Sequence, residues 1–229
     1  MSLTVGVIGL GPMGGNIAGN LLKNKFDIVG YDIESERMSA LSELGLEKAK
    51  SAVEVSERAD VLATSLPNAG SLHAVIKDVL RHSKPGQILI ECSTLTVAQK
   101  LDAHKQLSTG EKILLDSPIS GTPPMLAKMM ASIYVSGDQD AYQECEPVLE
   151  GFTATNFYVG EIGNGSRMKF LANYLVHVHV AAAAECMVMG EKAGLDPELI
   201  HTVLKESAGA SKMLDIRGAM MAKSDYREG

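Results

Sequence analysis

The chain has 229 residues and a formal net charge of −7 at pH 7, and 45% of its residues are hydrophobic. This length allows one large domain or two modest domains, and the apolar fraction is enough to form a core. The negative charge argues against nucleic acid and anionic membranes as main partners, because both repel an acidic protein. The cysteines, Cys92, Cys145 and Cys186, are far apart in the sequence. Their spacing indicates a reducing compartment rather than a disulfide framework or a zinc cluster.

The N-terminal sequence lacks the basic region of a signal peptide, since Val5–Ile8 already has the pattern of a buried strand. No uninterrupted apolar run reaches the roughly 18 residues that a membrane-spanning helix requires. The apolar stretch YLVHVHVAAAA is too short and contains His177 and His179. These features predict a soluble cytoplasmic protein without a membrane partner.

The stretch VGVIGLGPMGGNIAGNLL, Val5–Leu22, contains three glycines with the spacing G-x-G-x-x-G. A β-branched run precedes the glycines and a helical pattern follows them, which is the context that a dinucleotide-binding turn requires. Gly9 is expected to make the turn, Gly11 to let a pyrophosphate approach the backbone, and Gly14 to let helix and strand pack closely. Pro12 fits the first turn of the helix. The free N–H groups and partial positive charge of this helix N-terminus would attract phosphates.

An acidic residue follows the second expected strand. Asp32 ends the apolar run Ile28–Tyr31 and lies 18 residues after Gly14, about where a carboxylate meets the ribose hydroxyls of the adenosine half. A carboxylate there repels a 2′-phosphate, so NAD is favoured as the cofactor, and the nearby Arg37 leaves NADP open. The alternative is that Asp32 caps a helix beginning near Glu34, and a single side chain could serve both ends.

Strands and helices alternate along the following part of the chain. Strands are expected at Val61–Thr64, Ile88–Glu91, Ile113–Asp116 and Ile133–Ser136. Helices are expected at about Ser51–Arg58, Gly70–His82, Val97–Ser108 and Gln139–Leu149. This order predicts an α/β fold with a Rossmann-type, doubly wound parallel sheet. Ligands bind at the carboxyl ends of such strands, which singles out the segments Thr64–Asn68, Glu91–Thr96 and Asp116–Pro124.

The pattern changes after about Gly160, where the sequence GEIGNG interrupts the alternation. We place a domain boundary near Tyr158–Gly163, so that residues 1–160 form a dinucleotide-binding domain and residues 161–229 form a second domain. The second domain begins with a long helical pattern and continues with a helix that an Asp-Pro pair opens. It is therefore predicted to be all-helical.

The start of the long helix, expected over Ser166–Lys192, carries the strongest candidate for chemistry. Lys169 and Asn173 are four residues apart and therefore share one face of the helix. A lysine that faces a cleft is desolvated, which lowers its pKa toward the range useful for proton transfer. From spacing alone, the alternative is a solvated lysine on an exposed face. His177 and His179 point to different faces and are interpreted as packing residues, so no metal site is expected.

Four motifs resemble those of the β-hydroxyacid dehydrogenases, the family that contains 3-hydroxyisobutyrate dehydrogenase, tartronate semialdehyde reductase and the N-terminal part of 6-phosphogluconate dehydrogenase. In chain order they are GLGPMGGNIAGNLL, DSPISG, GNGSRMKFLAN and AAAECMVMGEKAGLDP. A lone G-x-G-x-x-G is a weak signal, but four ordered motifs are specific, and the resemblance covers nearly all of the chain. Relatives pair through their helical domains, so the resemblance implies a homodimer or a homotetramer.

The resemblance implies hydride transfer between NAD(P) and the hydroxyl carbon of a small β-hydroxy acid, or the reverse reaction of the semialdehyde or keto acid. Lys169 matches the catalytic general acid/base, and Asn173 matches the residue that holds the substrate near it. Ser120 and Gly121 match positions that bind the substrate carboxylate, and Ser120 is also expected to be catalytic. Thr122, the next residue, is expected to bind substrate as well. The expected cofactor contacts are Gly9, Leu10, Gly11, Pro12, Met13, Gly14, Asp32, Leu66, Pro67 and Thr94.

The sequence also departs from the family pattern. Thr122, followed by two prolines, stands where the family usually has a second glycine, and Ala172 stands where many members have the first of two asparagines. Relatives continue through further helices, so the helical domain is expected to be incomplete. Three alternatives remain: a non-catalytic NAD-binding regulatory module, an imine reductase of related architecture, and a methyltransferase that binds S-adenosylmethionine.

Overall fold

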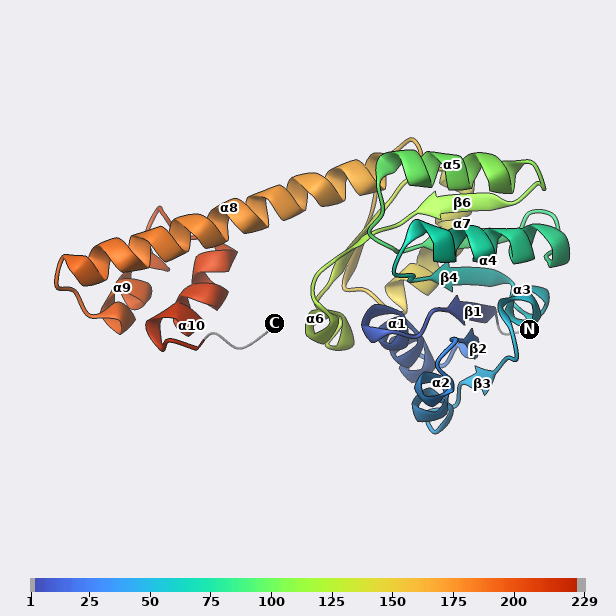
Figure 1. Cartoon of the computed structure of the whole chain (residues 1–229), viewed down its shortest axis with the longest axis horizontal. Coiled ribbons are helices and arrows are strands. Elements are labelled where there is room, and N and C mark those ends of the chain that lie inside the picture. Colours follow the sequence, from blue (N-terminus) through green and yellow to red (C-terminus); the bar gives the residue numbers. More distant parts are fainter. Residues whose placement is uncertain (1–2, 226–229) are drawn as a thin grey trace. The chain divides into compact units, whose positions relative to one another are not determined.

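The structure is a computed structural model that describes residues 3–225 (Figure 1). The chain divides into two compact units, Met1–Lys169 and Phe170–Gly229. Helix α8 (Asn164–Lys192) contains the division, so Lys169 is the last residue of the first unit. The segment Tyr158–Gly163, where the sequence pattern changes, lies immediately before this helix.

The first unit is built on a parallel sheet of six strands among the described residues, in the order β3-β2-β1-β4-β5-β6 (Figure 1). The strands are β1 (Thr4–Ile8), β2 (Asp27–Tyr31), β3 (Glu47–Lys48), β4 (Val61–Thr64), β5 (Ile88–Glu91) and β6 (Ile113–Asp116). The connecting helices are α1 (Pro12–Lys23), α2 (Ser35–Ser42), α3 (Ala52–Arg58), α4 (Ala69–His82) and α5 (Val97–Ser108). This is the doubly wound Rossmann-type sheet that the sequence predicts. The strand order reverses between β1 and β4, which is the point where such sheets bind ligands.

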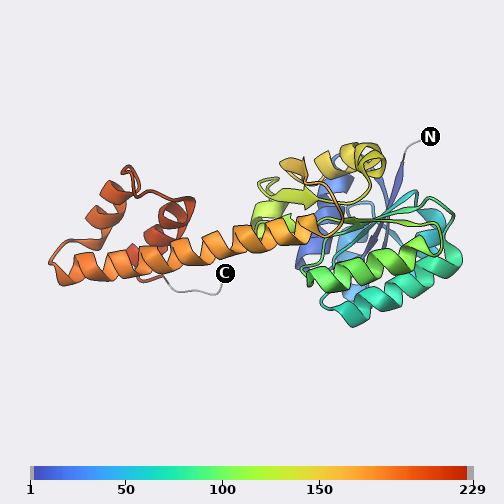
Figure 2. The same cartoon turned by 90° about the horizontal axis from the view of Figure 1, so that it is seen from above.

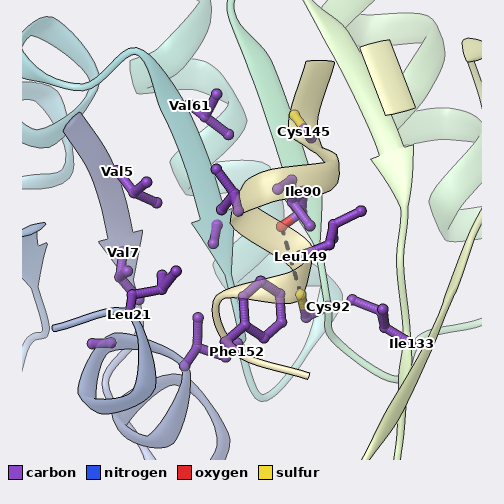
Figure 3. Close-up of a cluster of buried hydrophobic side chains, with 14 of the residues drawn as sticks. Val5, Val7, Leu21, Val61, Ile90, Cys92, Ile133, Cys145, Leu149 and Phe152 are labelled. Carbon is purple, nitrogen blue, oxygen red and sulfur yellow. Dashed lines mark hydrogen bonds between the residues drawn. The ribbon is translucent and has the colours of Figure 1, made fainter. Parts of the chain in front are cut away.

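Two hydrophobic layers hold the helices on the sheet, because each buried strand presents alternate side chains to opposite faces. On one face, Val7, Ile90 and Cys92 pack with Leu149 and Phe152, which come from helix α7 (Gln139–Glu150) and the residues just after it (Figure 3). The other face packs against α3, α4 and α5. Figure 2 shows α4 and α5 on one side of the sheet and α7 on the other. The layers leave the carboxyl ends of the strands as the edge where loops and helix starts meet.

One expected strand belongs to a different sheet. The run at Ile133–Ser136 forms β8 (Ser132–Val135), which does not extend the parallel sheet beyond β6. It lies in a second sheet, antiparallel to β7 (Ile119–Ser120) and parallel to β9 (Thr155–Tyr158). The chain leaves the first sheet at Pro118, which has no N–H for a strand ladder. Its carbonyl instead accepts a hydrogen bond from the Tyr134 N–H at 3.2 Å.

The second unit is helical, as predicted. After α8 come α9 (Pro197–Leu204), a π-helical turn (Leu214–Gly218) and α10 (Ala219–Ala222). Gly194 has a φ of +83° after the end of α8, the left-handed conformation that glycine adopts at helix C-termini, and Asp196 caps α9 by accepting the Leu199 N–H at 2.9 Å. A Cβ on Gly190 would lie 2.4 Å from Ile200 Cδ1, so this glycine lets α9 pack closely on α8.

Helix α8 is long and apolar enough to cross a membrane by length and composition alone. The sequence criterion of an uninterrupted apolar run missed it, because Asn173, His177 and His179 interrupt the run. The core helix of a soluble protein passes the same test, so this finding is weak evidence for a membrane span.

Candidate active site

The glycine-rich turn has the geometry that its spacing predicts. Gly9 has a φ of +86°, and a Cβ at this position would lie 2.5 Å from the Ser65 carbonyl oxygen. A Cβ on Gly14 would lie 1.8 Å from the carbonyl oxygen of Gly9, so α1 can approach the turn only with glycine there. By contrast, the nearest atom to a Cβ on Gly11 is 3.5 Å away. The backbone at Gly11, which begins α1 without a side-chain cap, is therefore open to a phosphate group.

A cavity of about 770 Å³ lies over this turn, in the size range of small-molecule sites. It collects residues from the turn, the end of β2 and the loop after β4. The predicted cofactor residues that line it are Gly9, Gly11, Pro12, Met13, Asp32, Leu66 and Pro67. Leu10 and Gly14 lie behind the surface, and Thr94 is exposed and does not line the cavity. The cavity therefore brings together most of the expected cofactor contacts.

Asp32 connects the two sides of this cavity. Its side chain is buried, and its Oδ2 accepts a hydrogen bond from the Leu10 N–H at 2.6 Å. Its Oδ1 accepts the Glu34 N–H at 2.8 Å just before α2 begins, so Asp32 both lines the cavity and supports the helix start. An ionised carboxylate has about four lone-pair sites, which leaves acceptor capacity for ribose hydroxyls. The two interpretations of Asp32 are therefore compatible.

The cavity is also lined by Arg37, which the sequence indicated only as a residue that leaves NADP open, and by one face of α4, which was not predicted. Arg37 Nη1 lies 3.4 Å from Asp32 Oδ2, and its Nη2 pairs with Glu34 at 2.9 Å. The α4 residues that line the cavity are Ser71, Ala74, Val75 and Asp78. Their spacing of three, four and seven residues is that of one helix face, a signal that was present in the sequence.

The loop after β4 is held from the neighbouring strand. The Leu66 N–H donates to the Ser93 hydroxyl at 2.8 Å, and Ser93 is buried just after β5. Leu66 and Pro67 line the cavity at this point. The segments that begin at Thr64 and Glu91 were singled out as ligand-binding segments at the carboxyl ends of strands, and this hydrogen bond joins them.

The substrate signature DSPISG continues from β6 into β7. Ser120 is half-buried at the end of β7, and Gly121 has a φ of +154°. A Cβ on Gly121 would lie 2.9 Å from Ala131 Cβ, so a side chain there would collide with the next segment. Thr122 is exposed and precedes the short helix α6 (Pro123–Ala127).

Two asparagines of α1 fix α6. Asn16 Nδ2 donates to the Pro123 carbonyl at 3.1 Å, and the buried Asn20 donates to the Leu126 carbonyl at 2.7 Å. The helix that follows the glycine-rich turn therefore also holds the segment after the substrate signature. Residues more than a hundred positions apart in the chain are joined in this way, as the sequence separations of 107 and 106 show.

Lys169 is buried in the first unit, with 9% of its surface exposed. Burial lowers the pKa of its ammonium group below the ordinary value for lysine. Its side chain makes no hydrogen bond or ion pair with any residue in the range 3–225. The alternative of a solvated lysine on an exposed face is therefore wrong, and the side chain is available for proton transfer. Asn173 lies one turn further along α8, in the second unit.

The start of α8 lies directly on the substrate signature. A Cβ on Gly165 would lie 2.4 Å from the Asp116 carbonyl oxygen, 2.6 Å from that of Tyr134 and 3.1 Å from Pro118 Cδ. Only glycine allows the helix to approach these strands so closely. The motifs DSPISG and GNGSRMK, far apart in the sequence, therefore meet in the first unit. Within residues 3–225, no group of three His, Cys, Asp or Glu side chains is arranged to hold a metal ion.

Comparison with known proteins agrees with this geometry. Residues 4–160 match the family model of the NAD binding domain of 6-phosphogluconate dehydrogenase. Residues 163–229 match the model described as the NAD-binding domain of NADP-dependent 3-hydroxyisobutyrate dehydrogenase. The two matches meet near the start of α8.

Two relatives illustrate the range of named activities. The L-threonate dehydrogenase of Cupriavidus necator is 32% identical over 230 residues, which cover 99% of this chain and 77% of the relative. The mitochondrial 3-hydroxyisobutyrate dehydrogenase of Mus musculus is 31% identical over 208 residues, 90% of this chain and 62% of the relative. The chain thus spans less than two thirds of the length of the mouse enzyme.

Solved structures of dehydrogenases and imine reductases are also similar to this chain. The 3-hydroxyisobutyrate dehydrogenase of Mycobacterium tuberculosis, in a structure with L-serine, has a TM-score of 0.92 and 27% identity, covering 100% of this chain and 81% of that one. An imine reductase from Myxococcus stipitatus, in complex with NAD+, has a TM-score of 0.81 at 19% identity, which shows the shared fold alone. The family models and the relatives together show that the chain belongs to the NAD(P)-dependent β-hydroxyacid dehydrogenase family.

Proposed function

We propose that the full-length protein is an NAD-preferring dehydrogenase that transfers a hydride between the nicotinamide and the hydroxyl carbon of a small β-hydroxy acid. The observation that carries this proposal is the buried Lys169 at the start of α8, whose side chain has no partner among residues 3–225, on the helix that lies on the DSPISG signature. A lysine in this state suits proton transfer, which must accompany hydride transfer at a hydroxyl carbon.

The residues of the first unit fit a dinucleotide. The turn at Gly9 and Gly11 leaves open the space that a pyrophosphate needs, and Asp32 offers a carboxylate to ribose hydroxyls. When bound, the nicotinamide supplies the hydride acceptor or donor, and the protein supplies binding, orientation and the proton. The cavity of about 770 Å³ has the size for this ligand class.

The preference for NAD rests on Asp32 and Arg37. The buried Asp32 carboxylate would repel a 2′-phosphate, whereas Arg37 lies at the same wall of the cavity and would attract one. In the structure Arg37 is engaged with Asp32 and Glu34. The guanidinium is therefore already partly neutralised, which supports NAD as the preferred cofactor and leaves NADP as a weaker one.

The chemical step assigns one role to each group. In oxidation, neutral Lys169 takes the proton of the substrate hydroxyl as the hydride leaves the same carbon. In reduction, protonated Lys169 returns that proton to the carbonyl oxygen. Ser120 and Gly121 are proposed to bind the substrate carboxylate, and Asn173 is proposed to hold the substrate near Lys169.

The substrate class is a small hydroxy acid. The relatives named above act on L-threonate and 3-hydroxyisobutyrate, and a further relative from Eubacterium barkeri, 28% identical, is a 2-(hydroxymethyl)glutarate dehydrogenase. The acids in these names each carry a carboxylate and a hydroxyl group. Thr122 and the two prolines that begin α6, at the end of the signature, depart from the usual family pattern and are the features that would select among such acids.

Two assays on the full-length protein test this proposal. Thermal unfolding with NAD, NADP or S-adenosylmethionine reports binding, because a ligand of the native state raises its stability. Reduction of NAD and NADP is then followed with a panel of three- to five-carbon β-hydroxy acids. NAD-dependent turnover of at least one acid is the expected result. NAD binding with no turnover would instead favour a regulatory module, and stabilisation only by S-adenosylmethionine would favour a methyltransferase.

The proposal also covers partners and location. The second unit exposes many apolar side chains along α8, such as Leu171, Tyr174 and Leu175, and such surfaces mark association sites. We therefore propose a homodimer or homotetramer, to be tested by light scattering, and no membrane or nucleic acid partner.

The free thiols of Cys92, Cys145 and Cys186 support a cytoplasmic location.

A further inference from the structure

Strands β5 and β6 each end in a buried acid, and one buried lysine joins them. Glu91, Asp116 and Lys100 have fully buried side chains. Lys100 reaches from α5, where its Nζ pairs with Glu91 Oε2 and lies 3.0 Å from Asp116 Oδ1. The same Nζ donates to the Glu91 carbonyl oxygen at 3.1 Å. The register of the parallel strands β5 and β6 places Glu91 beside Asp116, so both acids are on the α5 side of the sheet.

This cluster carries one more negative than positive charge when all three groups are ionised. Burial disfavours the charged form of Lys100, but attraction to Glu91 and Asp116 outweighs it, so the pKa of Lys100 is raised above its ordinary value. An uncompensated buried carboxylate is costly, so the extra charge needs hydrogen-bond donors. The Ser93 N–H donates to Glu91 Oε1 at 3.0 Å, and Asp116 accepts hydrogen bonds from the Ser136 hydroxyl and from the start of α8.

Asp116 caps α8 across a large sequence separation. The Ser166 N–H donates to Asp116 Oδ2 at 2.8 Å and the Ser166 hydroxyl donates to Asp116 Oδ1 at 2.9 Å, over 50 residues of sequence. The neighbouring Gly165 N–H donates to the Ser136 hydroxyl at 2.9 Å. Two of the first N–H groups of α8 are therefore satisfied by the side chains of Asp116 and Ser136. The negative charge at this helix N-terminus also interacts favourably with the helix dipole.

The cap lies less than one helical turn from Lys169. Ser166 precedes Lys169 by three residues, so a rotation or shift of the first turn moves the lysine with it. Lys169 has no side-chain partner of its own among residues 3–225. Its position therefore depends on how the helix start is held, and Asp116 and Lys100 are the buried charges that hold it.

We propose that Asp116, fixed by Lys100 and hydrogen-bonded to Ser166, is the positioning residue that sets the helix start and keeps Lys169 buried and aligned for proton transfer. The role in proton transfer rests on the function proposed above. The structural part, that the cap holds Lys169 buried, is independent of that function. Asp116 itself makes no contact with substrate in this account and acts only through Ser166 and the helix.

The test uses Ser166→Ala in the full-length protein, because this change removes one hydrogen bond and leaves the backbone cap. We expect kcat for the hydroxy acid to fall about tenfold to a hundredfold, since misplacement of a catalytic group by about 1 Å costs up to this much. The KM for NAD should stay within about twofold of the wild-type value, because interactions that are equally strong in the ground state and the transition state are not affected. Ser166→Thr keeps a hydroxyl and should recover part of the loss. Ser56→Ala, which removes a buried hydroxyl bonded to the Val53 carbonyl at 2.8 Å, is the matched control.

A double-mutant cycle distinguishes failure of this positioning role from failure of the proposed dehydrogenase function. If Ser166 acts through Lys169, Ser166→Ala should cause no further loss of activity in the Lys169→Ala protein. An equal loss in both backgrounds, or no loss in the wild-type background, would overturn the proposal. If Lys169→Ala itself keeps full activity, the proposed function has failed instead.

A second readout does not depend on turnover. NMR titration of ¹³C-labelled lysine reports the pKa of Lys169 in each variant. We expect Ser166→Ala to raise this pKa toward the ordinary value for lysine, because a loosened helix start exposes the ammonium to water. An unchanged Lys169 titration in Ser166→Ala would show that the cap does not control its environment and would overturn the structural part of the proposal.

Discussion

The Asp32 carboxylate accepts the Leu10 N–H at 2.6 Å, and this hydrogen bond ties the end of β2 to the glycine-rich turn. The same carboxylate accepts the Glu34 N–H and lies near Arg37. One buried acid thus fixes the shape of the turn, the start of α2 and the position of a cation at the cavity wall. Cofactor selection and local structure therefore depend on the same side chain.

Replacing Asp32 with alanine should weaken NAD binding by about tenfold to a hundredfold, because the Leu10 N–H loses its acceptor and the ribose loses its carboxylate. NADP binding should weaken less, since the repulsion of its 2′-phosphate disappears. Isothermal titration of both cofactors measures this change in preference. Arg37→Ala is the opposite variant and should weaken NADP more than NAD. If Asp32→Ala kept the wild-type ratio of the two affinities, the role of Asp32 in selection would be wrong.

The pH dependence of the reaction should follow the lowered pKa of Lys169. In oxidation the neutral amine is the active form, so kcat/KM rises with pH and levels off above the Lys169 pKa. In carbonyl reduction the ammonium is active, so the rate falls over the same range. Because burial lowers this pKa, the inflection lies below the ordinary lysine value of about 10.4. Initial rates in both directions between pH 6 and pH 11 measure it. An oxidation rate that falls as pH rises would contradict the assignment.

Two glycines of α1 should respond in opposite ways to alanine. Gly14→Ala places a Cβ 1.8 Å from the Gly9 carbonyl oxygen, which forces α1 away from the turn and should cost about 1–3 kcal/mol or more. Gly19→Ala places a Cβ 4.0 Å from Leu41 Cδ2, an ordinary contact, and should stabilise the helix by about 0.5–1 kcal/mol. Chemical denaturation measures both variants, and NAD should stabilise only the Gly19 variant. Equal stability of the two variants would mean that the turn is not packed as described.

The Ser93 hydroxyl should matter for the cofactor and not for proton transfer. Ser93→Ala removes the acceptor of the Leu66 N–H, which lies on the loop that lines the cavity. We expect the KM for NAD to rise about threefold to tenfold, with kcat nearly unchanged. Steady-state kinetics with varied NAD measure this. A loss in kcat with an unchanged KM would place Ser93 in a different role.

The parallel sheet could be predicted from the sequence because its strands are short apolar runs bounded by turn residues. The runs Val61–Thr64, Ile88–Glu91 and Ile113–Asp116 have the predicted bounds in the structure. The run near β8 has the same pattern but belongs to the second sheet. Its partners, β7 and the half-exposed β9, are too short or too polar to be recognised by periodicity.

The glycine-rich turn could be predicted because steric limits at Gly9 and Gly14 leave a signature in the sequence. The burial of Lys169 could not be derived from spacing, since the start of its helix packs through Gly165 against Asp116 and Tyr134, which are distant in the sequence. The family resemblance indicated the lysine where the local pattern favoured an exposed one. The Lys100 cluster was missed, although Lys100, Ala103 and Leu107 share a buried helix face, a pattern that singles out a lysine among apolar residues.

Whether Lys169 is the proton-transfer group is best decided by measuring turnover by Lys169→Ala in the full-length protein, with NAD and the best hydroxy acid of the panel. We expect kcat to fall by about a hundredfold or more, as for loss of a general acid/base, while NAD affinity stays close to that of the wild type. Turnover by Lys169→Ala equal to that of the wild type would contradict the assignment of Lys169 as the proton-transfer group.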